Sequence, residues 1–146
     1  MKFKLIIDPN QEEQVVVTAH APSALTHRLE QLVLDEEGGQ VTGYTDTDTV
    51  LLPYEAIECV TVVEGKTYAI TADGQRCRLR QRLYEMEQRL PDCFLRINKS
   101  TLANRHRLVR FSASFSGGVD AVFRSGYTDY VSRRCLADIK RRLEQT

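Results

Sequence analysis

The sequence predicts a mainly β protein, α+β overall, in which an antiparallel β-rich domain follows a small strand-strand-helix element. Three observations favour this class. From about residue 40 onward hydrophobic residues recur with a period of two, as in half-buried strands. Gly-containing turns separate these segments, and two stretches with helical periodicity interrupt and close the series. A chain of 146 residues, of which 42% are hydrophobic, is long enough to build such a core.

Residues 1–40 are expected to form the N-terminal element. FKLII and QVVVTA are strand-like, and Asp-Pro-Asn at residues 8–10 supplies turn chemistry between them. Residues 23–34 then place leucine and valine at helical spacing before a Gly-Gly stop at 38–39. Because a hairpin and one helix are too small to be stable alone, we expect residues 1–40 to stabilise the protein or to form its dimer contact.

Residues 41–146 are expected to form the β-rich domain. Its strand candidates are separated by turns at residues 64–65, 73–74, 117–118 and 125–126. In chain order the candidates are VTGY, TVLLPYEAI, ECVTVV, TYAIT, QRCRL, FLRI, RLVRFSASF, VDAVF and TDYV.

A first helix is predicted over residues 79–90, where apolar residues share one face before the stop at Pro91. Arg80, Arg82, Gln88 and Arg89 are expected to face solvent. A second helix closes the chain, with Leu136, Ile139 and Leu143 on its buried face and Ser132 as its N-cap.

Arg133 and Arg134 fall in the first turn of that last helix. The helix dipole disfavours cations there by roughly 0.3–1 kcal/mol each. The misfit becomes favourable if a phosphate or a guanine edge binds at this position. Two solvated arginines at a frayed helix start are the equal alternative.

The charges of the chain are strongly divided. Residues 1–75 hold 4 Lys and Arg against 13 Asp and Glu, whereas residues 76–146 hold 16 against 7, giving net charges of −9 and +9. In residues 94–111, FLRINKSTLANRHRLVRF, cationic and apolar residues alternate, which is typical of polyanion binding. Because most of these arginines lie outside any amphipathic helix, nucleic acid is a better interpretation than a membrane surface. Acidic and basic surfaces that only confer solubility are the alternative.

The sequence predicts no metal and no cofactor. Cys59, Cys77, Cys93 and Cys135 lie 18, 16 and 42 residues apart without a CxxC pair, and their apolar neighbours indicate small buried hydrophobes. No run of eighteen apolar residues could span a membrane, and the N-terminus lacks a signal-peptide pattern. We therefore expect a cytoplasmic protein without membrane insertion.

From about residue 43 to residue 143 the chain resembles the LytTR family of bacterial DNA-binding domains. The family pattern F-x-R-x-(H/N)-(K/R)-S-(Y/T)-(L/I)-(V/A)-N corresponds to FLRINKSTLAN at residues 94–104, and the family's S-R segment before a terminal helix corresponds to residues 132–134. Two departures occur: the histidine common at the position of Asn98 is absent, and Thr101 replaces a frequent tyrosine.

The resemblance implies a LytTR-like fold and a sequence-specific regulator of transcription that binds double-stranded DNA through loops rather than a recognition helix. The implied contact points are Lys66 with Thr67, Asn98 with Lys99 and Ser100, and Arg133 with Arg134. Only about forty residues precede the match, fewer than a receiver domain needs. The resemblance therefore implies a stand-alone regulator without direct control by aspartyl phosphorylation, and binding as a homodimer.

We predict a division of labour within this set. Lys99 and Arg134 are the candidates for base readout, because Lys or Arg to guanine O6 and N7 is the commonest specific contact. A second group is expected to neutralise phosphates and to give salt-dependent affinity. Its members are Arg96, Lys66, Arg105 and Arg133. For Arg96, a structural ion pair with an acidic residue is an equal alternative.

Two other functions are compatible with parts of the sequence. Asp46 and Asp48 could serve a metal-dependent hydrolase, but no HxH, ExxH or G-x-S-x-G pattern stands nearby, so we interpret them as turn residues and predict no enzymatic activity. The other alternative is an RNA-binding or protein-interaction module. RNA readers expose aromatic platforms, whereas inward core positions are expected here for Phe94, Phe111, Phe115 and Phe123.

Overall fold

The computed structural model describes residues 1–144, with residue 31 and residues 34–38 described by their backbone alone. The chain divides into two compact units, Met1–Glu37 and Gly38–Thr146. None of the helices in the described range is long and apolar enough to cross a bilayer. The second unit contains all the strands and all the predicted contact points.

The first unit consists of helix α1, Ala24–Gly38, and the extended segment that precedes it. Ser23 caps the helix, because the N–H of Thr26 donates to Ser23 Oγ at 3.3 Å and the N–H of Ser23 donates to Thr26 Oγ1 at 2.8 Å. The helix ends at Gly38, within the predicted Gly-Gly stop, and the φ of 58° at Gly39 suits the left-handed position after a helix.

The strands predicted within residues 1–23 are wrong. The turn between them does form, because the N–H of Gln11 donates to the carbonyl of Asp8 at 3.2 Å. Residues 1–23 nevertheless contain no strand, and their large apolar side chains are exposed. The reason is that a two-stranded hairpin is at best marginal without a third strand or a packed face.

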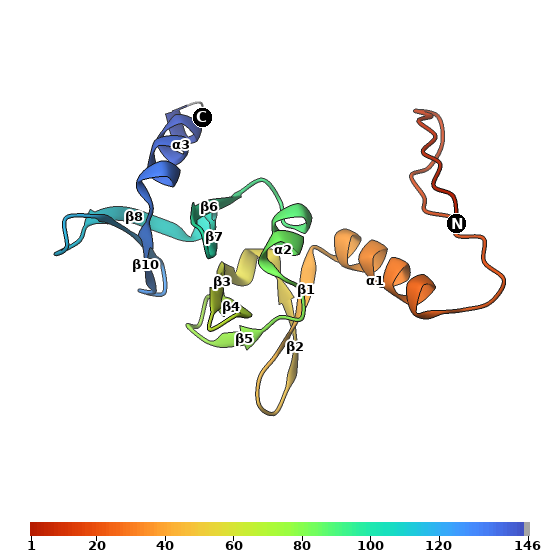
Figure 1. The fold of residues 1–146 in the computed structure, drawn as a ribbon, viewed down its shortest axis with the longest axis horizontal. Coiled ribbons are helices and arrows are strands. Elements are labelled where there is room, and N and C mark those ends of the chain that lie inside the picture. The colour runs from red at the N-terminus through yellow and green to blue at the C-terminus, as the bar shows by residue number, and fades with distance from the viewer. Residues whose placement is uncertain (145–146) are drawn as a thin grey trace. The chain divides into compact units, whose positions relative to one another are not determined.

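The second unit is built on a seven-stranded sheet, here sheet A, with the order β2-β1-β5-β4-β3-β7-β6. Its strands are labelled in Figure 1. All neighbouring strands are antiparallel. The strands are β1 Gln40–Tyr44, β2 Thr49–Pro53, β3 Ile57–Val63, β4 Lys66–Thr71, β5 Arg76–Arg78, β6 Phe94–Asn98 and β7 Thr101–Asn104.

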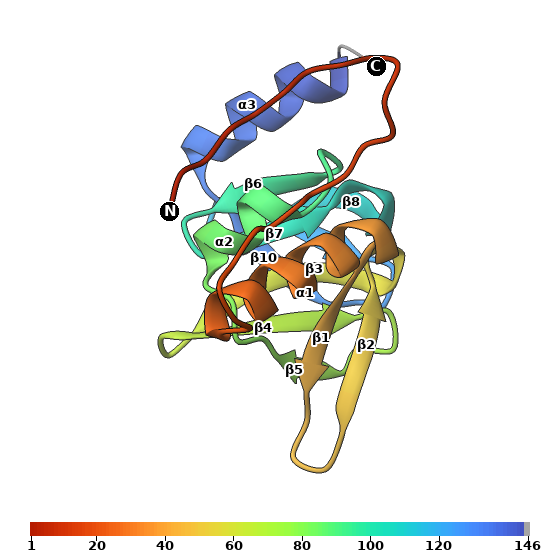
Figure 2. The same ribbon diagram turned by 90° about the vertical axis from the view of Figure 1, so that its right-hand side faces the viewer.

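A three-stranded antiparallel sheet, sheet B, follows with the order β10-β9-β8. Its strands are β8 Leu108–Ala113, β9 Val119–Phe123 and β10 Thr128–Val131. Helix α2, Leu83–Arg89, comes between β5 and β6 in the sequence. Helix α3, Arg133–Glu144, follows β10 and packs beside β6 (Figure 2). Single 3-10 turns occupy Tyr54–Ala56 and Arg105–Arg107.

The central strands of sheet A are buried on both faces, and their period of two divides the apolar residues between two cores. Val60 and Ala69 pack with α2 residues such as Met86 in the first core. Their neighbours Cys59 and Ile70 point to the opposite face and pack in the second core. That core also contains residues of sheet B and α3, namely Ala121, Phe123, Val131 and Ile139. One face of the central strands therefore fastens sheet B and α3 to sheet A.

Each of the nine segments predicted as strands after residue 40 contains a strand. β7 was missed, because all four of its residues are buried and show no period of two. The helix predicted over residues 79–90 begins only at Leu83. Leu79 instead continues beside β4, where its N–H donates to the carbonyl of Thr67 at 2.9 Å.

Two side chains lie contrary to prediction. Arg89, expected in solvent, is half-buried and donates to the hydroxyl of Tyr54 at 3.0 Å and to the carbonyl of Gln40 at 2.8 Å. Phe115, expected in the core, is fully exposed. β8 ends at Ala113, so Phe115 lies in the turn beyond the sheet and has no layer to pack against.

The sequence indicates small buried hydrophobes at the four free cysteines, and this is confirmed for two of them. Cys59 and Cys77 are buried, and Cys93 and Cys135 are half-buried. Burial raises the pKa of the Cys59 thiol far above its ordinary value, and the neighbouring carboxylates raise it further. Burial is also the largest cause that raises the pKa of Cys77 and of Cys93. A thiol with a raised pKa is a poor nucleophile at neutral pH, which favours a packing role.

A buried ion pair fastens β3 to the segments that flank sheet B. Glu58 is fully buried, and its Oε2 accepts from Arg107 Nε at 2.8 Å. Its Oε1 accepts from the backbone N–H of Ser125 at 2.7 Å. Both carboxylate oxygens are therefore satisfied, and the loss of either partner would leave a buried charge uncompensated.

Arg107→Met should lower the free energy of unfolding by about 3 kcal/mol, because it leaves the Glu58 carboxylate buried and unpaired. The double variant Glu58→Gln/Arg107→Met should recover part of this loss. Urea unfolding measures both, with the exposed Arg110→Met as the control. A single variant as stable as the wild type would contradict the role given to this pair.

Candidate nucleic-acid interface

Two turns of sheet A meet at one end of the sheet. Glu64 and Gly65 turn the chain from β3 to β4 with φ angles of 51° and 77°. Lys99 and Ser100 turn it from β6 to β7. The turns are adjacent because β7 pairs with β3, and the N–H of Val62 donates to the carbonyl of Ser100 at 2.9 Å.

The start of α3 joins the same end from sheet B. The N–H of Ser132 donates to the carbonyl of Ile97 at 2.9 Å, so the chain enters α3 directly beside β6. Ser132 caps the helix as predicted, since its Oγ accepts from the N–H of Cys135 at 3.2 Å. We use the name loop edge for the three segments that meet here, residues 64–66, 98–100 and 132–134.

Asn98 ties the β6–β7 turn to β10. Its side chain is fully buried, and its Nδ2 donates to the carbonyl of Tyr130 at 2.8 Å and to Asp129 Oδ1 at 3.4 Å. Its Oδ1 accepts from the N–H of Ser100 at 2.8 Å. The amide is thus committed to holding the loop, and Lys99 stands exposed at its tip.

A chain of hydroxyls extends this connection into sheet A. Thr101 Oγ1 donates to Asp129 Oδ2 at 2.7 Å and lies 2.8 Å from Thr61 Oγ1. The side chains of Asn98, Thr101 and Asn104 in the FLRINKSTLAN motif therefore form hydrogen bonds within the fold. Thr101, which stands where the family often has tyrosine, is buried in this network.

Arg96 takes the structural alternative that the sequence left open. Its Nε donates to Glu87 Oε2 at 2.8 Å, and its Nη1 donates to the carbonyl of Lys99 at 2.9 Å. The guanidinium therefore links α2 to the β6–β7 turn. It supports the loop that carries Lys99 from the side opposite Asn98's contact with β10.

A hollow of about 990 Å³ joins the β6–β7 turn to the first turns of α3. It brings together four predicted site residues from distant parts of the sequence, Arg96, Asn98, Lys99 and Arg134. Tyr130, Ser132 and Arg141 also line it. Tyr130 is half-exposed, and Arg141 pairs with Asp138 at 2.7 Å. The prediction missed Tyr130 as a lining residue, although it lies only two residues before the predicted S-R segment at residues 132–134.

The other predicted residues lie outside this hollow. Lys66 is exposed at the loop edge, while Thr67 beside it is buried. Arg133 is exposed in the first turn of α3. Arg105 lies at the opposite end of β7 from Ser100, where its N–H donates to the carbonyl of Cys93 at 2.8 Å. The structure therefore gathers the predicted set at one end of the sheet except for Arg105.

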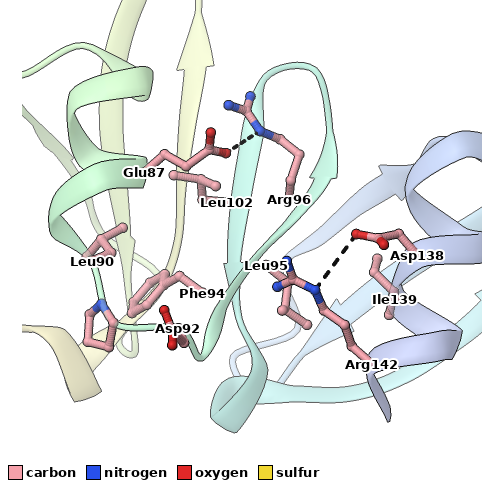
Figure 3. Close-up of a pocket in the computed structure, with 11 residues that line it drawn as sticks. Glu87, Leu90, Asp92, Phe94, Leu95, Arg96, Leu102, Asp138, Ile139 and Arg142 are labelled. Carbon is pink, nitrogen blue, oxygen red and sulfur yellow. Dashed lines mark hydrogen bonds and ion pairs between the residues drawn. The ribbon is translucent and has the colours of Figure 1, made fainter. Parts of the chain in front are cut away.

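A smaller pocket of about 190 Å³ lies on the other side of Arg96, between α2, β6 and α3 (Figure 3). Its floor is apolar, with Leu95 and Ile139 among its residues. Its two arginines are paired, Arg96 with Glu87 at 2.8 Å and Arg142 with Asp138 at 3.8 Å, and Asp92 also lines the pocket (Figure 3). Because both arginines are neutralised and Asp92 adds a negative charge, the pocket is a poor anion site.

Asp46 and Asp48 lie exposed in the turn between β1 and β2. The N–H of Thr45 donates to the carbonyl of Asp48 at 2.9 Å, and the N–H of Asp48 donates back to Thr45 Oγ1 at 3.0 Å. This is the geometry of a hairpin turn. Across the described residues, no three His, Cys, Asp or Glu side chains gather in a way that could hold a metal ion.

Comparisons with known proteins agree with this architecture. A family model described as the LytTr DNA-binding domain matches residues 47–144. Two HTH-type transcriptional regulators of Staphylococcus aureus, described as uncharacterized, are each 30% identical to this chain with 98% of both sequences covered, one from strain MRSA252 and one from strain NCTC 8325 / PS 47. A LytTr DNA-binding domain from Bacillus cereus superposes with a TM-score of 0.64 at 20% identity, over 71% of this chain and 95% of that one.

The fold and the DNA-binding role in transcription that the sequence predicts are confirmed by these matches. The family model covers the loop edge, the hollow and both sheets except for the first strand and its flank. The chain therefore belongs to the LytTR family of DNA-binding domains.

Proposed function

We propose that this regulator binds specific sites in double-stranded DNA through its loop edge. The observation that carries the proposal is the meeting of Lys99 and Arg134 in one hollow, although 35 positions separate them in the sequence. Among the described residues neither has an ion-pair partner. Two uncompensated cations held at one end of a rigid sheet suit an anionic, groove-bearing ligand.

We assign base readout to Lys99 and Arg134. Lys99 stands at the tip of a turn that Asn98 and Arg96 hold from two sides, so its backbone is positioned before DNA arrives. Such preorganisation reduces the entropy lost on binding. Arg134 projects from the first turn of a helix whose buried residue Ile139 fixes it to the second core.

The remaining predicted residues take two roles in this proposal. Lys66, Arg133 and Arg105 neutralise phosphates, with Lys66 and Arg133 exposed at the loop edge itself. A second group positions the loops through hydrogen bonds or burial rather than through contact with DNA. This group comprises Asn98, Ser100, Thr67 and Arg96.

The first turn of α3 supports this assignment on electrostatic grounds. It contains no acidic residue, and Arg133 and Arg134 face the positive end of the helix dipole. A cation there is disfavoured by roughly 0.3–1 kcal/mol. A phosphate at the same place would neutralise both arginines and accept hydrogen bonds from the free backbone N–H groups of the helix.

Recognition of DNA bases through loops fits the topology of this chain better than recognition through a helix-turn-helix motif. The relatives from Staphylococcus aureus carry the words HTH-type in their names. In residues 1–144 of this chain, strands separate α1, α2 and α3 from one another, so no two helices are joined by a short turn.

We also propose that two copies bind as a homodimer through residues 1–37. Leu25 and Leu32 of α1 are 38% and 53% exposed, and apolar side chains of the preceding segment are exposed as well. Residues 1–37 hold three basic and seven acidic residues, so phosphate would repel them. We further propose that the protein is a non-enzymatic regulator, because its family is a DNA-binding family. We also propose that it acts in the bacterial cytoplasm.

Lys99→Ala and Arg134→Ala should each weaken binding to the preferred duplex by roughly 1–3 kcal/mol while changing binding to random duplex much less. The preferred site is obtained by selection from random DNA, and titration by fluorescence anisotropy gives both affinities. Arg110→Ala, which removes an exposed arginine of β8, is the matched control. Equal losses on both duplexes would show that Lys99 and Arg134 contact the backbone instead.

Affinity should depend strongly on salt. If the protein neutralises about 6 phosphates, binding should fall by about a thousandfold between roughly 50 and 200 mM salt. Duplex DNA should also displace single-stranded RNA in competition and remain intact in the presence of magnesium. Salt-independent binding would contradict the proposal, and cleavage of the duplex would restore the enzymatic alternative.

Removal of residues 1–37 should abolish self-association and leave recognition of a single half-site intact. The full-length variant Leu25→Ser/Leu32→Ser should have the same effect on association, because it removes the exposed apolar side chains of α1 without shortening the chain. Sedimentation velocity gives the oligomeric state, and anisotropy on one and two half-sites gives recognition. Unchanged association in both proteins would rule out this segment as the dimer contact.

A further inference from the structure

A row of three arginines lies on the exposed face of sheet A at β5. Arg76, Arg78 and Arg80 are exposed, while Cys77 and Leu79 between them are buried. The period of two directs the guanidinium groups of Arg76 and Arg78 to the same face, and Arg80, two residues beyond the end of β5, joins them by stacking on Tyr44, the β1 neighbour of Arg78. We use the name arginine strip for Arg76, Arg78 and Arg80.

Two tyrosines hold the ends of the arginine strip in place. The guanidinium of Arg76 lies 4.5 Å from the ring centroid of Tyr68, and that of Arg80 lies 4.6 Å from the ring centroid of Tyr44. Tyr68 of β4 and Tyr44 of β1 are both register partners of Arg78, so they flank the middle arginine on its two sides. Stacking on an aromatic face restricts the guanidinium while leaving its N–H groups available.

The charge of the strip is not compensated within the described chain. None of the three arginines takes part in an ion pair, in contrast to Arg96 and Arg107. Asp73, in the turn between β4 and β5, is the nearest acidic residue in the sequence and lies at the Arg76 end. The positive potential should therefore be strongest toward Arg78 and Arg80.

The arginine strip leads toward the loop edge. Because the N–H of Leu79 donates to the carbonyl of Thr67, Arg80 comes level with Lys66, the first residue of β4. Lys66 and Tyr68 alternate on β4 and share the face of the strip. The cations thus continue from Lys66 down the sheet, away from the hollow that holds Lys99 and Arg134.

We propose that the arginine strip binds the phosphate backbone of the same duplex, outside the bases that the loop edge reads. This inference rests on the proposed function. Alternate residues of a strand are about 6.7 Å apart, so the strip spans roughly 13 Å. One DNA strand carries a charge every 3.4 Å or so along its axis, and about four phosphates fit along that length. Arginine also matches phosphate oxygens with two parallel hydrogen bonds.

The two tyrosine rings favour phosphate over stacked bases as the ligand of the arginine strip, because both rings are already covered by arginines. A reader of single-stranded nucleic acid needs aromatic faces open for stacking. Here each ring of Tyr44 and Tyr68 already has a guanidinium over it. The strip therefore presents guanidinium N–H groups rather than free aromatic platforms.

The test uses the full chain with Arg78→Gln/Arg80→Gln, compared with Arg78→Lys/Arg80→Lys, which keeps the charge. Arg110→Gln/Arg124→Gln removes two exposed arginines of sheet B and its turn as the matched control. The probe is a selected duplex, either with about one helical turn of flanking DNA on each side or trimmed to the recognised bases. Thermal unfolding verifies that each variant is folded.

On the long duplex the glutamine variant should bind about tenfold more weakly or worse. The plot of log association constant against log salt concentration should become less steep by about 1.8, which is 0.9 for each lost phosphate contact. Base preference and affinity for the trimmed duplex should not change. The lysine variant should keep the salt slope, and the control should resemble the wild type.

If the wild type binds its site and the glutamine variant binds the long duplex equally well or better, the phosphate contact of the arginine strip is overturned. The proposed function is then unaffected. A loss that is equal on long and trimmed duplexes overturns this contact too, because it would then fall within the recognised bases. A wild type that binds no duplex overturns the proposed function together with the strip. If the glutamine variant loses affinity for single-stranded RNA but keeps its affinity for the duplex, the arginine strip binds RNA, and the proposed duplex contact is overturned.

Discussion

The side-chain amide of Asn98 is the interaction on which the geometry of the interface depends. It is buried where the end of sheet A meets β10; its nitrogen donates across that junction to β10, and its oxygen accepts from Ser100 within the β6–β7 turn. A buried amide left unsatisfied would cost about 1–3 kcal/mol. The two sheets are therefore held in the one arrangement that satisfies it, and this arrangement places Lys99 opposite Arg134.

The basic residues of the chain separate into two groups by their partners. Arg107 and Arg96 are paired with Glu58 and Glu87, and they join elements of the fold. Lys99, Arg134 and the arginine strip have no such partner in the described chain and are exposed. A cation whose charge the fold already neutralises adds little to the field outside the protein. The count of 16 Lys and Arg in residues 76–146 therefore overstates the number of unpaired cations that a ligand would meet.

The same rigid sheet explains how short loops can serve as a reading surface. A turn of two residues has few contacts of its own and would be mobile at the end of an isolated hairpin. Here the β6–β7 turn is held by Asn98, by Arg96 and by the ladder to β3. α3 is likewise anchored by Ile139 in the second core, so its first turn is fixed relative to β6. Such support from neighbouring residues is what a recognition site needs for a defined geometry.

The sequence by itself determined the class of the fold, the strands after residue 40 other than β7, the cap at Ser132 and the family. These depend on local periodicity, turn chemistry and a dense motif, all of which are properties of neighbouring residues. Only the tertiary structure decided that Asn98 is buried and that Arg96 pairs with Glu87. It also decided that residues 1–23 form no strands and that Phe115 is exposed. The physical reason is the same in each case: a strand, an ion pair or a buried side chain requires a partner distant in the sequence, and the pattern of a segment does not specify that partner.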